Sequence, residues 1–420
     1  MIEIKPMSHL TATVSVPGSK SYTQRALVTA ALAMGTSRLR NILFSEDTQY
    51  LMEALGKLGA NIKIEDNDLV VAGTGGRIVA PGEDLFMGNN GTALRFLMSL
   101  ASLGTGTCTM TGEGRLCERP VGALVEALRH LGATVHTRNG GGYPPVRVES
   151  NGLTGGEVTF RDTESSQYVS SILLSAPYAH GDVTVRLEGH TVSQPYIRMT
   201  VDTMRKFGVI VHTRGDNHYV VPGNQSYRGR QYLVEGDASS ASYFFMAAVL
   251  CRGSVTVMNM KPESCQGDLQ ILDYLQALGC SVRRGDSWIE VTGHPLPEGE
   301  YHFDMGDLPD MVPTMAVLSA FRPGRTVISN VAHLRIKESN RIEALVMELN
   351  RFGVDTRETP DGLVIDGGHP IGTEIETYND HRIAMSFAVA GLAAPGVKIR
   401  DEHCVNKSFP RFWDALGSLS

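Results

Sequence analysis

The sequence predicts an α/β protein of two domains, each built from three copies of one repeated unit. Five segments repeat an amphipathic helix, a Leu-Gly or Phe-Gly pair and a strand, at even spacing. A sixth copy begins near the end of the 420-residue sequence, and an unmatched strand stands near its beginning. Together these observations predict six equal units divided into two groups of three.

The five complete copies are recognised by the glycine that follows each helix. Glycine suits the left-handed backbone position after a helix. Each copy also has an earlier helix, so the unit is predicted as strand–helix–strand–helix–strand–strand. The glycines are 73, 76, 71 and 74 residues apart, and they are Gly59, Gly132, Gly208, Gly279 and Gly353. Spacing this regular indicates repeated copies of one structural unit.

The sixth copy begins at Phe412, and no strand follows its helix in the sequence. A strand within Met1–Val16 precedes the first unit, so we expect this strand to complete the sixth unit. The first domain is then predicted over residues 18–233, and the second over residues 1–17 together with residues 234–420. The chain would cross between the two domains twice.

The first helix of the chain carries a candidate anion site. A strand at Ala12–Val16 leads into it, and Ser21 with Gln24 three residues later predicts a helix start with a capping box. Lys20 lies at this start and Arg25 shares a face with Ser21, where the helix dipole and unpaired N–H groups favour an anion. The alternative is an ordinary capped helix with solvated charges.

Composition limits the classes of function. A content of 42% hydrophobic and 20% charged residues is typical of a soluble globular protein. The net charge of −7 disfavours a protein of nucleic acid or membrane surfaces. The six cysteines form no Cys-x-x-Cys pair, which favours reduced thiols in a cytosolic protein over disulfides or a zinc site. The N-terminus shows no signal pattern, and the apolar run Ile383–Val397 is too short to span a bilayer.

Cations recur at or beside the predicted helix starts despite the negative net charge. Arg119 and Arg341 lie where the helix dipole disfavours a cation, unless an anion lies between the cation and the helix end. Ser165-Ser166-Gln167 adds hydroxyl and amide donors of the kind that hold phosphate oxygens. The alternative for each cation is a solvated surface charge. The set is Lys20, Arg25, Arg95, Arg119, Lys337, Arg341, Arg382 and Lys407.

Two carboxylates stand beside these cations and are candidates for proton transfer. Asp310 begins a predicted helix, so a plain N-cap is its alternative. Glu338 lies next to Lys337 and three residues before Arg341, so a surface ion pair is its alternative. We expect His381 to be a structural histidine and not a catalytic one.

These residues fall within ten motifs spread over essentially the whole sequence: PGSKSYTQRAL (17–27), GNNGTALRFL (88–97), GEGRLCERPVGAL (112–124), SSQ (165–167), VSQPYI (192–197), EGDASSASYF (235–244), DLPDM (307–311), RIKESNRIEAL (335–345), YNDHRIAM (378–385) and NKSFPRF (406–412). By these motifs the sequence resembles the 5-enolpyruvylshikimate-3-phosphate (EPSP) synthase family. The resemblance implies two inverted, inside-out α/β barrel domains of three βαβαββ units, with the active site in the cleft between them.

The resemblance also implies an activity and a set of site residues. Members of the family transfer the enolpyruvyl group of phosphoenolpyruvate to the 5-hydroxyl of shikimate 3-phosphate and release phosphate, with no cofactor and no metal. The implied acid–base residues are Asp310 and Glu338, with Lys20 also catalytic. The implied shikimate-phosphate contacts are Lys20, Ser21, Arg25, Ser165, Ser166, Gln167, Ser193, Tyr196, Asp310, His333 and Lys337. The implied phosphoenolpyruvate contacts are Lys20, Gly91, Arg119, Gln167, Arg341, Arg382 and Lys407.

Some positions depart from the family pattern and keep alternatives open. His333 stands where the family commonly has Asn, Phe96 where it has Pro, and Asn90 where it has Ala. The closest alternative is the enolpyruvyl transferase that acts on UDP-N-acetylglucosamine, which uses a loop cysteine near the position of Cys117. An alternative of another class is a non-catalytic sugar-phosphate-binding protein, which would not need both Asp310 and Glu338. We further expect a cytoplasmic monomer.

Overall fold

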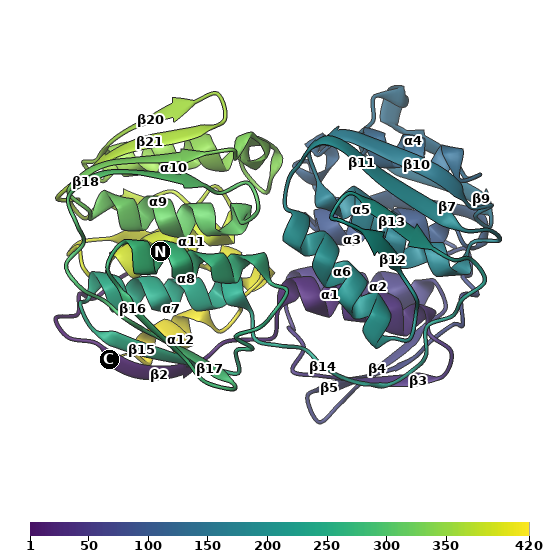
Figure 1. The fold of residues 1–420 in the computed structure, drawn as a ribbon, viewed down its shortest axis with the longest axis horizontal. Coiled ribbons are helices and arrows are strands. Elements are labelled where there is room, and N and C mark those ends of the chain that lie inside the picture. Colours follow the sequence, from purple (N-terminus) through teal and green to yellow (C-terminus); the bar gives the residue numbers. More distant parts are fainter. Residues whose placement is uncertain (420) are drawn as a thin grey trace. The chain divides into compact units, whose positions relative to one another are not determined.

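The computed structural model describes residues 1–419, which form two compact units. One unit is continuous in sequence, Lys20–Val234, and is called the continuous unit. The other joins Met1–Ser19 to the chain from Glu235 onward, and is called the split unit. Figure 1 labels the elements of both. Among the described residues, no helix combines the length and the apolar character needed to cross a membrane.

The continuous unit holds six helices and twelve strands of the described chain. They are α1 (Lys20–Leu32), β3 (Thr36–Arg40), α2 (Glu46–Lys57), β4 (Asn61–Glu65), β5 (Asp68–Ala72), β6 (Leu85–Phe86), α3 (Gly91–Ala101), β7 (Thr105–Thr111), α4 (Gly122–His130), β8 (Thr134–Thr137), β9 (Val146–Asn151), β10 (Gly156–Thr163), α5 (Ser166–Ser175), β11 (Val183–Thr191), α6 (Gln194–Lys206), β12 (His212–Arg214), β13 (His218–Val221) and β14 (Gln231–Leu233).

The split unit repeats this pattern with several short 3-10 turns. Its helices and strands are β1 (Ile2–Glu3), β2 (Thr11–Ser15), α7 (Ala238–Leu250), β15 (Ser254–Met258), α8 (Ile271–Ala277), β16 (Ser281–Arg284), β17 (Trp288–Thr292), β18 (Gly299–Asp304), α9 (Val312–Ala320), β19 (Gly324–Ser329), α10 (Arg341–Arg351), β20 (Asp355–Thr359), β21 (Gly362–Gly367), β22 (Glu374–Ile375), α11 (His381–Ala390), β23 (Lys398–Ile399) and α12 (Phe412–Gly417). The 3-10 turns used below are η4 (Gly267–Gln270), η5 (Pro309–Met311), η6 (Ala332–Ile336) and η7 (Glu402–Lys407).

The sheets confirm the repeated unit. Five four-stranded sheets share one order, as in β6-β7-β9-β8 and β18-β19-β21-β20. In each, the leading strand runs parallel to the second strand of the unit, and the hairpin of the last two strands runs antiparallel beside it. A parallel pair needs a crossover connection, which α3, α5 and α9 supply for β6-β7, β10-β11 and β18-β19.

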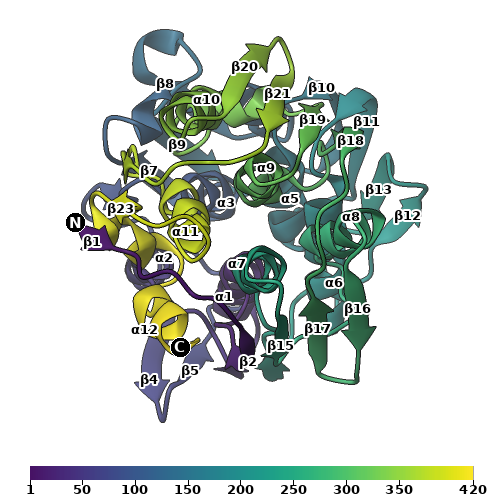
Figure 2. The same cartoon turned by 90° about the vertical axis from the view of Figure 1, so that its left-hand side faces the viewer.

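Helices lie inside each unit and the sheets lie outside, so the predicted inverted α/β fold is confirmed. Figure 2 shows α7, α9 and α11 end-on in the middle of the split unit, with sheets around them. These three helices pack on one another and are buried on every side. In the continuous unit α1, α3 and α5 do the same. A helix that is apolar all round belongs in a core, whereas the amphipathic second helix of each unit keeps one polar face.

The N-terminal residues confirm one prediction. They also show that the leading strands of the first and fourth repeats are exchanged, which the sequence did not reveal. β1 pairs antiparallel with β23, so Ile2–Glu3 completes the sixth sheet as predicted. β2, however, leads the sheet of the fourth unit, where it lies parallel to β15. β14 leads the sheet of the first unit, parallel to β3. Each segment that crosses between the two domains therefore supplies the leading strand of a sheet whose other strands lie far away in the sequence.

The two crossing segments run against each other within the split unit. The N–H of Ser19 donates to the carbonyl of Glu235 at 2.8 Å, and the N–H of Asp237 donates to the carbonyl of Pro17 at 2.9 Å. Gly18 and Gly236 form an antiparallel bridge between them. The chain therefore leaves and re-enters the split unit through one short two-stranded connection.

The helix ends follow the predicted chemistry with three corrections. The five repeat glycines adopt φ values of 110°, 99°, 89°, 87° and 80°, as expected after a helix. α1 begins at Lys20, so Ser21 lies inside its first turn and is not the predicted cap. Proline suits the first turn of a helix, so the sequence predicts Pro120, Pro195 and Pro410 in that position. Pro195 does lie in the first turn of α6, but Pro120 and Pro410 precede α4 and α12 by two residues.

Candidate active site

The side chain of Lys20 lies at the start of α1 and is held by a carboxylate. Its Nζ donates to Oδ2 of Asp47, in the first turn of α2, at 3.2 Å. The two side chains are 14% and 5% exposed, so the ion pair is largely shielded from water. The amide of Asn90 donates to the carbonyl oxygen of Asp47 at 2.7 Å and to Oε1 of Gln24 at 3.1 Å. The starts of α1, α2 and α3 are therefore tied together around Lys20.

Arg25 is a buried crosslink between helices. Its Nε donates to Oγ1 of Thr200 at 2.7 Å, and its Nη2 donates to Oγ of Ser170 and to the carbonyl of Tyr196. Its Nη1 donates to the carbonyl of Ser21 at 3.0 Å. These four bonds use four of the five guanidinium N–H groups. Burial lowers the pKa of Arg25 to about 10, so the side chain is still cationic at neutral pH.

Gly91, the first residue of α3, lies directly against a guanidinium. A Cβ atom on Gly91 would stand 2.7 Å from Cζ of Arg119, so only glycine leaves room for this contact. Arg119 is 3% exposed. Its guanidinium therefore sits close to the backbone N–H groups at the start of α3, a combination suited to an anion.

Gln167 connects α5 with α3. Its Oε1 accepts a hydrogen bond from Nη1 of Arg95, and its Nε2 donates to Oγ1 of Thr92 at 2.9 Å. Its backbone N–H donates to Oγ of Ser165, which caps α5. The side-chain amide is thus fixed in orientation by two neighbours from α3.

The remaining predicted residues of the continuous unit lie at the starts of α5 and α6. Ser166 is the first residue of α5, and Ser193 precedes α6 with a left-handed backbone at φ 59°. Such a conformation is uncommon outside glycine and is often found at functional positions. Tyr196 follows in the first turn of α6. The continuous unit therefore brings Lys20, Ser21, Arg25, Gly91, Arg119, Ser165, Ser166, Gln167, Ser193 and Tyr196 to helix starts or the segments before them.

In the split unit, three carboxylates converge on one buried arginine. Arg341 is 1% exposed and donates to Asp310 Oδ1 at 3.0 Å and to Glu338 Oε2 at 2.9 Å. Its Nε donates to Asp380 Oδ2 at 2.8 Å. Arg382 adds a bond from Nη2 to Asp310 Oδ2 at 2.7 Å. Both candidate proton-transfer groups therefore touch the same guanidinium.

These contacts decide the alternatives for both carboxylates. Asp310 lies inside η5 with its side chain on two arginines, so the plain N-cap interpretation is wrong. Glu338 does pair with Arg341, but both side chains are largely buried, so this is not a surface ion pair. Within residues 1–419, no group of three His, Cys, Asp or Glu side chains is placed to hold a metal ion.

The local charges stabilise the cationic arginine. Burial alone would lower the pKa of Arg341, but Asp380, Glu338 and Asp310 outweigh burial and raise it. Burial raises the pKa of the nearby Tyr243 hydroxyl to about 12, although Arg382 opposes this shift. Tyr243 is therefore a neutral hydrogen-bonding group in this cluster at physiological pH.

The other predicted residues of the split unit lie on its 3-10 turns. His333 is 6% exposed within η6, and Lys337 is half-buried at the end of that turn. Lys407 is buried at the end of η7. All three belong to the segments that immediately precede α10 and α12.

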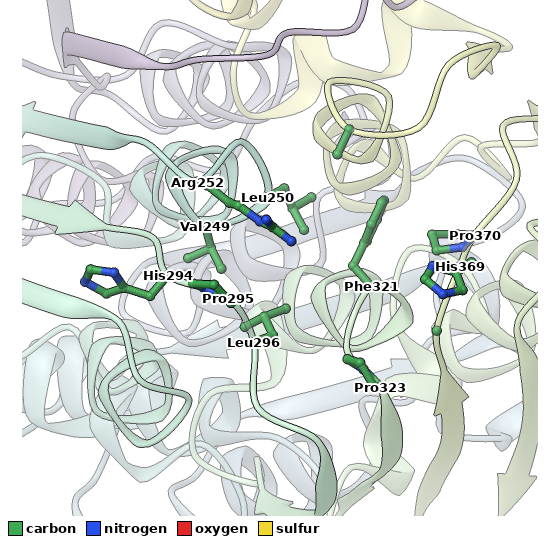
Figure 3. Close-up of a pocket in the computed structure, with 12 residues that line it drawn as sticks. Val249, Leu250, Arg252, His294, Pro295, Leu296, Phe321, Pro323, His369 and Pro370 are labelled. Atoms are coloured by element: carbon green, nitrogen blue, oxygen red, sulfur yellow. The ribbon is translucent and has the colours of Figure 1, made fainter.

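A separate cavity of about 380 Å³ lies elsewhere in the split unit (Figure 3). Its lining includes Leu250, Phe321 and Ala393, at or just beyond the C-terminal ends of α7, α9 and α11. Asp310, Asp380 and Arg382 lie at the opposite, N-terminal ends of α9 and α11, and Arg341 begins α10. None of the predicted site residues lines this cavity.

Sequence reasoning named the cations but missed most of their partners. Asp47 and Asp380 were not among the predicted site residues, yet each forms an ion pair with a cation that was. Thr92, Ser170 and Thr200 were not singled out at all. A useful signal was available for Asp380, because it caps α11 two residues before Arg382 and accepts a bond from the Arg382 N–H at 3.0 Å.

The fold and these helix-start residues define an inverted α/β protein with cationic, hydroxyl and amide side chains at its helix starts and a carboxylate pair on one buried arginine. Comparison with known proteins is specific. The family model described as EPSP synthase (3-phosphoshikimate 1-carboxyvinyltransferase) matches residues 4–416. The chain belongs to this family.

Individual relatives agree over their full length. The chain is 43% identical over 415 residues to a 3-phosphoshikimate 1-carboxyvinyltransferase of Nostoc punctiforme, covering 98% of this chain and 97% of the relative. It is 42% identical over 421 residues to that of Syntrophobacter fumaroxidans, covering 99% of each. A solved EPSP synthase structure from Acinetobacter baumannii superposes with a TM-score of 0.83 at 29% identity, covering 100% of this chain and 98% of the other.

The resemblance found in the motifs is therefore confirmed. The chain is an enolpyruvyl transferase that moves the enolpyruvyl group of phosphoenolpyruvate to shikimate 3-phosphate.

Proposed function

We propose that the two sets of side chains described above act on the same pair of substrates, with Asp310 and Glu338 as the proton-transfer groups. The observation that carries this proposal is the contact of Asp310 and Glu338 with the single guanidinium of Arg341. A shared cation holds both carboxyl groups close together, which suits a pair of groups that exchange protons with one substrate. The continuous unit supplies hydroxyl, amide and cationic donors and no comparable carboxylate pair among the predicted site residues.

The predicted site residues are assigned to the two substrates as follows. Shikimate 3-phosphate is held by Lys20, Ser21, Arg25, Ser165, Ser166, Gln167, Ser193, Tyr196, Asp310, His333 and Lys337. Phosphoenolpyruvate is held by Lys20, Gly91, Arg119, Gln167, Arg341, Arg382 and Lys407. Lys20 belongs to both sets, because an ammonium group at the start of α1 can lie between two anions. Arg25 has one N–H of Nη1 beyond its four protein bonds, so its main work is to fix α1, α5 and α6 in place.

The reaction is an addition followed by an elimination. A base removes the proton of the 5-hydroxyl group while an acid protonates the methylene carbon of phosphoenolpyruvate, giving a tetrahedral intermediate. In the elimination the two groups exchange roles: the former acid removes a proton from the new methyl group, and the former base gives its proton to the departing phosphate. Asp310 and Glu338 take these two roles, and Arg341, Arg382, Arg119 and Lys20 stabilise the charge on the phosphate and carboxylate groups.

The test is phosphate release on mixing the purified protein with both substrates. Phosphate should appear only when phosphoenolpyruvate and shikimate 3-phosphate are present together. UDP-N-acetylglucosamine in place of shikimate 3-phosphate should give none. Release with the nucleotide sugar would favour the other enolpyruvyl transferase. Cys117 would then be the candidate for the loop cysteine that the other transferase uses; its Sγ lies 3.7 Å from the carbonyl oxygen of Gly112.

We also propose that the enzyme works as a cytoplasmic monomer without a cofactor. The two units together hold every residue assigned to the site, so a second copy is not needed to complete it. Light scattering during size-exclusion chromatography tests this proposal. A mass near 45.5 kDa supports the monomer, and a doubled mass at assay concentrations contradicts it.

A further inference from the structure

A buried carboxylate that carries no role above lies behind Arg382. Asp268 is the second residue of η4 and is 5% exposed. Its Oδ2 accepts a hydrogen bond from Oγ of Ser239, in the first turn of α7, at 2.5 Å. Oγ of Ser239 in turn accepts a hydrogen bond from Nη2 of Arg382 at 3.4 Å. One hydroxyl group therefore connects Asp268 to an arginine of the proposed phosphoenolpyruvate site.

The connection continues to a catalytic carboxylate. The same Nη2 of Arg382 donates to Oδ2 of Asp310 at 2.7 Å. This nitrogen carries two hydrogen atoms, so its bonds to Ser239 and Asp310 occupy both of them. Any change in charge at Asp268 acts on the arginine and, beyond it, on Asp310.

The surroundings of Asp268 favour its neutral form. The pKa of its carboxyl group is raised to about 7, mainly by burial and next by the charge of Asp310. Arg382 and the hydrogen bond from Ser239 lower the pKa, while Asp237, the cap of α7, raises it. Asp268 therefore changes its charge near neutral pH, far above the ordinary pKa of about 3.9 for aspartate.

We propose that Asp268 is a positioning residue whose charge, transmitted through Ser239 and Arg382, sets how strongly the site holds phosphoenolpyruvate. The proposal rests on the function proposed above for Arg382 and Asp310. When Asp268 is neutral, the arginine is balanced mainly by Asp310 and attracts the incoming anion. When Asp268 is ionised, it adds a negative charge behind the arginine and weakens that attraction. Affinity for phosphoenolpyruvate therefore falls as the pH rises through 7.

The experiment compares the wild type with Asp268→Asn. The amide oxygen of asparagine still accepts the Ser239 hydrogen bond, but the side chain carries no charge. KM for phosphoenolpyruvate is measured from pH 6 to pH 8.5 at saturating shikimate 3-phosphate. From pH 6 to pH 8.5 the KM of the wild type should increase by a larger factor than the KM of the variant. The two factors should differ by up to about tenfold, the change that corresponds to one pKa unit. kcat should change less than KM does, because Asp310 lies one step further from Asp268 than Arg382 does. Equal pH dependence of KM in both proteins would overturn the proposal.

A second measurement follows the titration of Asp268 without substrate. The folded protein holds the Asp268 proton more tightly than the unfolded chain does, so this group lowers stability as pH rises from about 4 to about 7. Urea unfolding should therefore show the wild type losing stability relative to Asp268→Asn over this window and no further above it. Parallel stability curves would mean that Asp268 does not titrate there and would also overturn the proposal.

Two further variants separate the hydrogen-bond route from a general charge effect. Ser239→Ala should keep the pH dependence of unfolding but lose most of the pH dependence of KM, because the connecting hydroxyl is gone. Full retention of the KM effect in this variant would contradict the route through Ser239. Asp237→Asn keeps an equally good helix cap and removes one nearby charge. It should retain the KM effect with its midpoint moved to lower pH, and loss of the effect would argue against Asp268.

Failure of this inference is distinct from failure of the proposed function. Absence of phosphate release from the wild type at every pH would contradict the proposed function. The unfolding comparison would still decide whether Asp268 titrates in the stated window.

Discussion

Arg341 is the residue around which the charges of the split unit are arranged. It bonds to Asp310, Glu338 and Asp380 while it is almost completely buried. Removal of one partner from a buried ion-pair network leaves an uncompensated charge, which destabilises the fold as well as the site. Substitutions that keep the shape of the side chain therefore report on chemistry more cleanly than truncations do.

We expect Asp310→Asn and Glu338→Gln each to lower kcat by about 100-fold or more, the usual scale for a positioned acid or base. An amide oxygen can still accept the Arg341 hydrogen bond, but the group no longer exchanges a proton at neutral pH. Phosphate release gives the rate, and urea unfolding checks that the variants remain folded. Glu343→Gln is the matched control, because this residue is exposed on α10 and bonds to Asn340. Near wild-type turnover in either test variant would remove that residue from the mechanism.

At the scale of single elements, the start of α3 is shaped by close packing against Arg119. The helix is capped by Asn90, whose Oδ1 accepts from the N–H of Ala93 at 2.9 Å, and Gly91 follows directly. Since Asn90 also bonds to Gln24 and to the backbone of Asp47, this helix start has little freedom to move. A larger residue at position 91 must therefore displace the arginine.

We expect Gly91→Ala to lower kcat/KM for phosphoenolpyruvate by about tenfold or more. A displaced Arg119 loses charge-assisted bonds to the substrate, which are worth about 1.5–3 kcal/mol each. Gly114→Ala is the control, since a Cβ atom there meets nothing within 4 Å. Steady-state kinetics should show a change in the first variant alone. An unchanged KM for phosphoenolpyruvate in Gly91→Ala would mean that Arg119 does not bind that substrate.

The exchange of leading strands is a second element-scale feature, and Gly253 tests it. A Cβ atom on Gly253 would lie 1.9 Å from the carbonyl oxygen of Leu10, just before β2 pairs with β15. We expect Gly253→Ala to lower the free energy of unfolding by about 2 kcal/mol or more, because rigid backbone must shift. Gly56→Ala in α2 meets nothing within 4 Å and should instead stabilise by about 0.5–1 kcal/mol. Urea unfolding measures both, and an unaffected Gly253→Ala would contradict the pairing of β2 with β15.

At the scale of the whole molecule, the residues assigned to the site are divided between the two units. Neither unit alone supplies both the donor set around Lys20 and the carboxylate pair on Arg341. The chain passes from one unit to the other along two short segments, next to Gly18 and Gly236. Such a connection suits a hinge, because few backbone angles need to change.

We therefore expect bound anions to favour a closed arrangement. A ligand that contacts both sets of cations supplies the differential binding energy that shifts the population. Closure would also keep water from a reactive intermediate. Small-angle scattering with shikimate 3-phosphate and an inert phosphoenolpyruvate mimic should give a smaller radius of gyration than the free protein gives. If the radius stays the same at saturation, from an open free form, the hinge argument fails.

The parts of the structure that the sequence predicted are those encoded by nearby residues. The repeat glycines and the alternating strands are local patterns, and they correctly gave the βαβαββ unit. The exchange of β2 and β14 was not predictable, because each pairs with a strand far along the chain and both have ordinary strand patterns. Likewise the motifs named Arg341 and Arg382, but only three-dimensional packing shows that Asp380 and Asp268 lie against this cluster.

The insertion of the continuous unit between the two parts of the split unit has a consequence for biosynthesis. Every strand and helix of the continuous unit has been translated once Val234 leaves the ribosome, so this unit can fold while synthesis proceeds. β1 and β2 are translated first, yet their partners β23 and β15 come much later. Until then these strands have unpaired edges, which is the kind of surface that chaperones cover. The earliest part of the chain is therefore among the last to reach its native place.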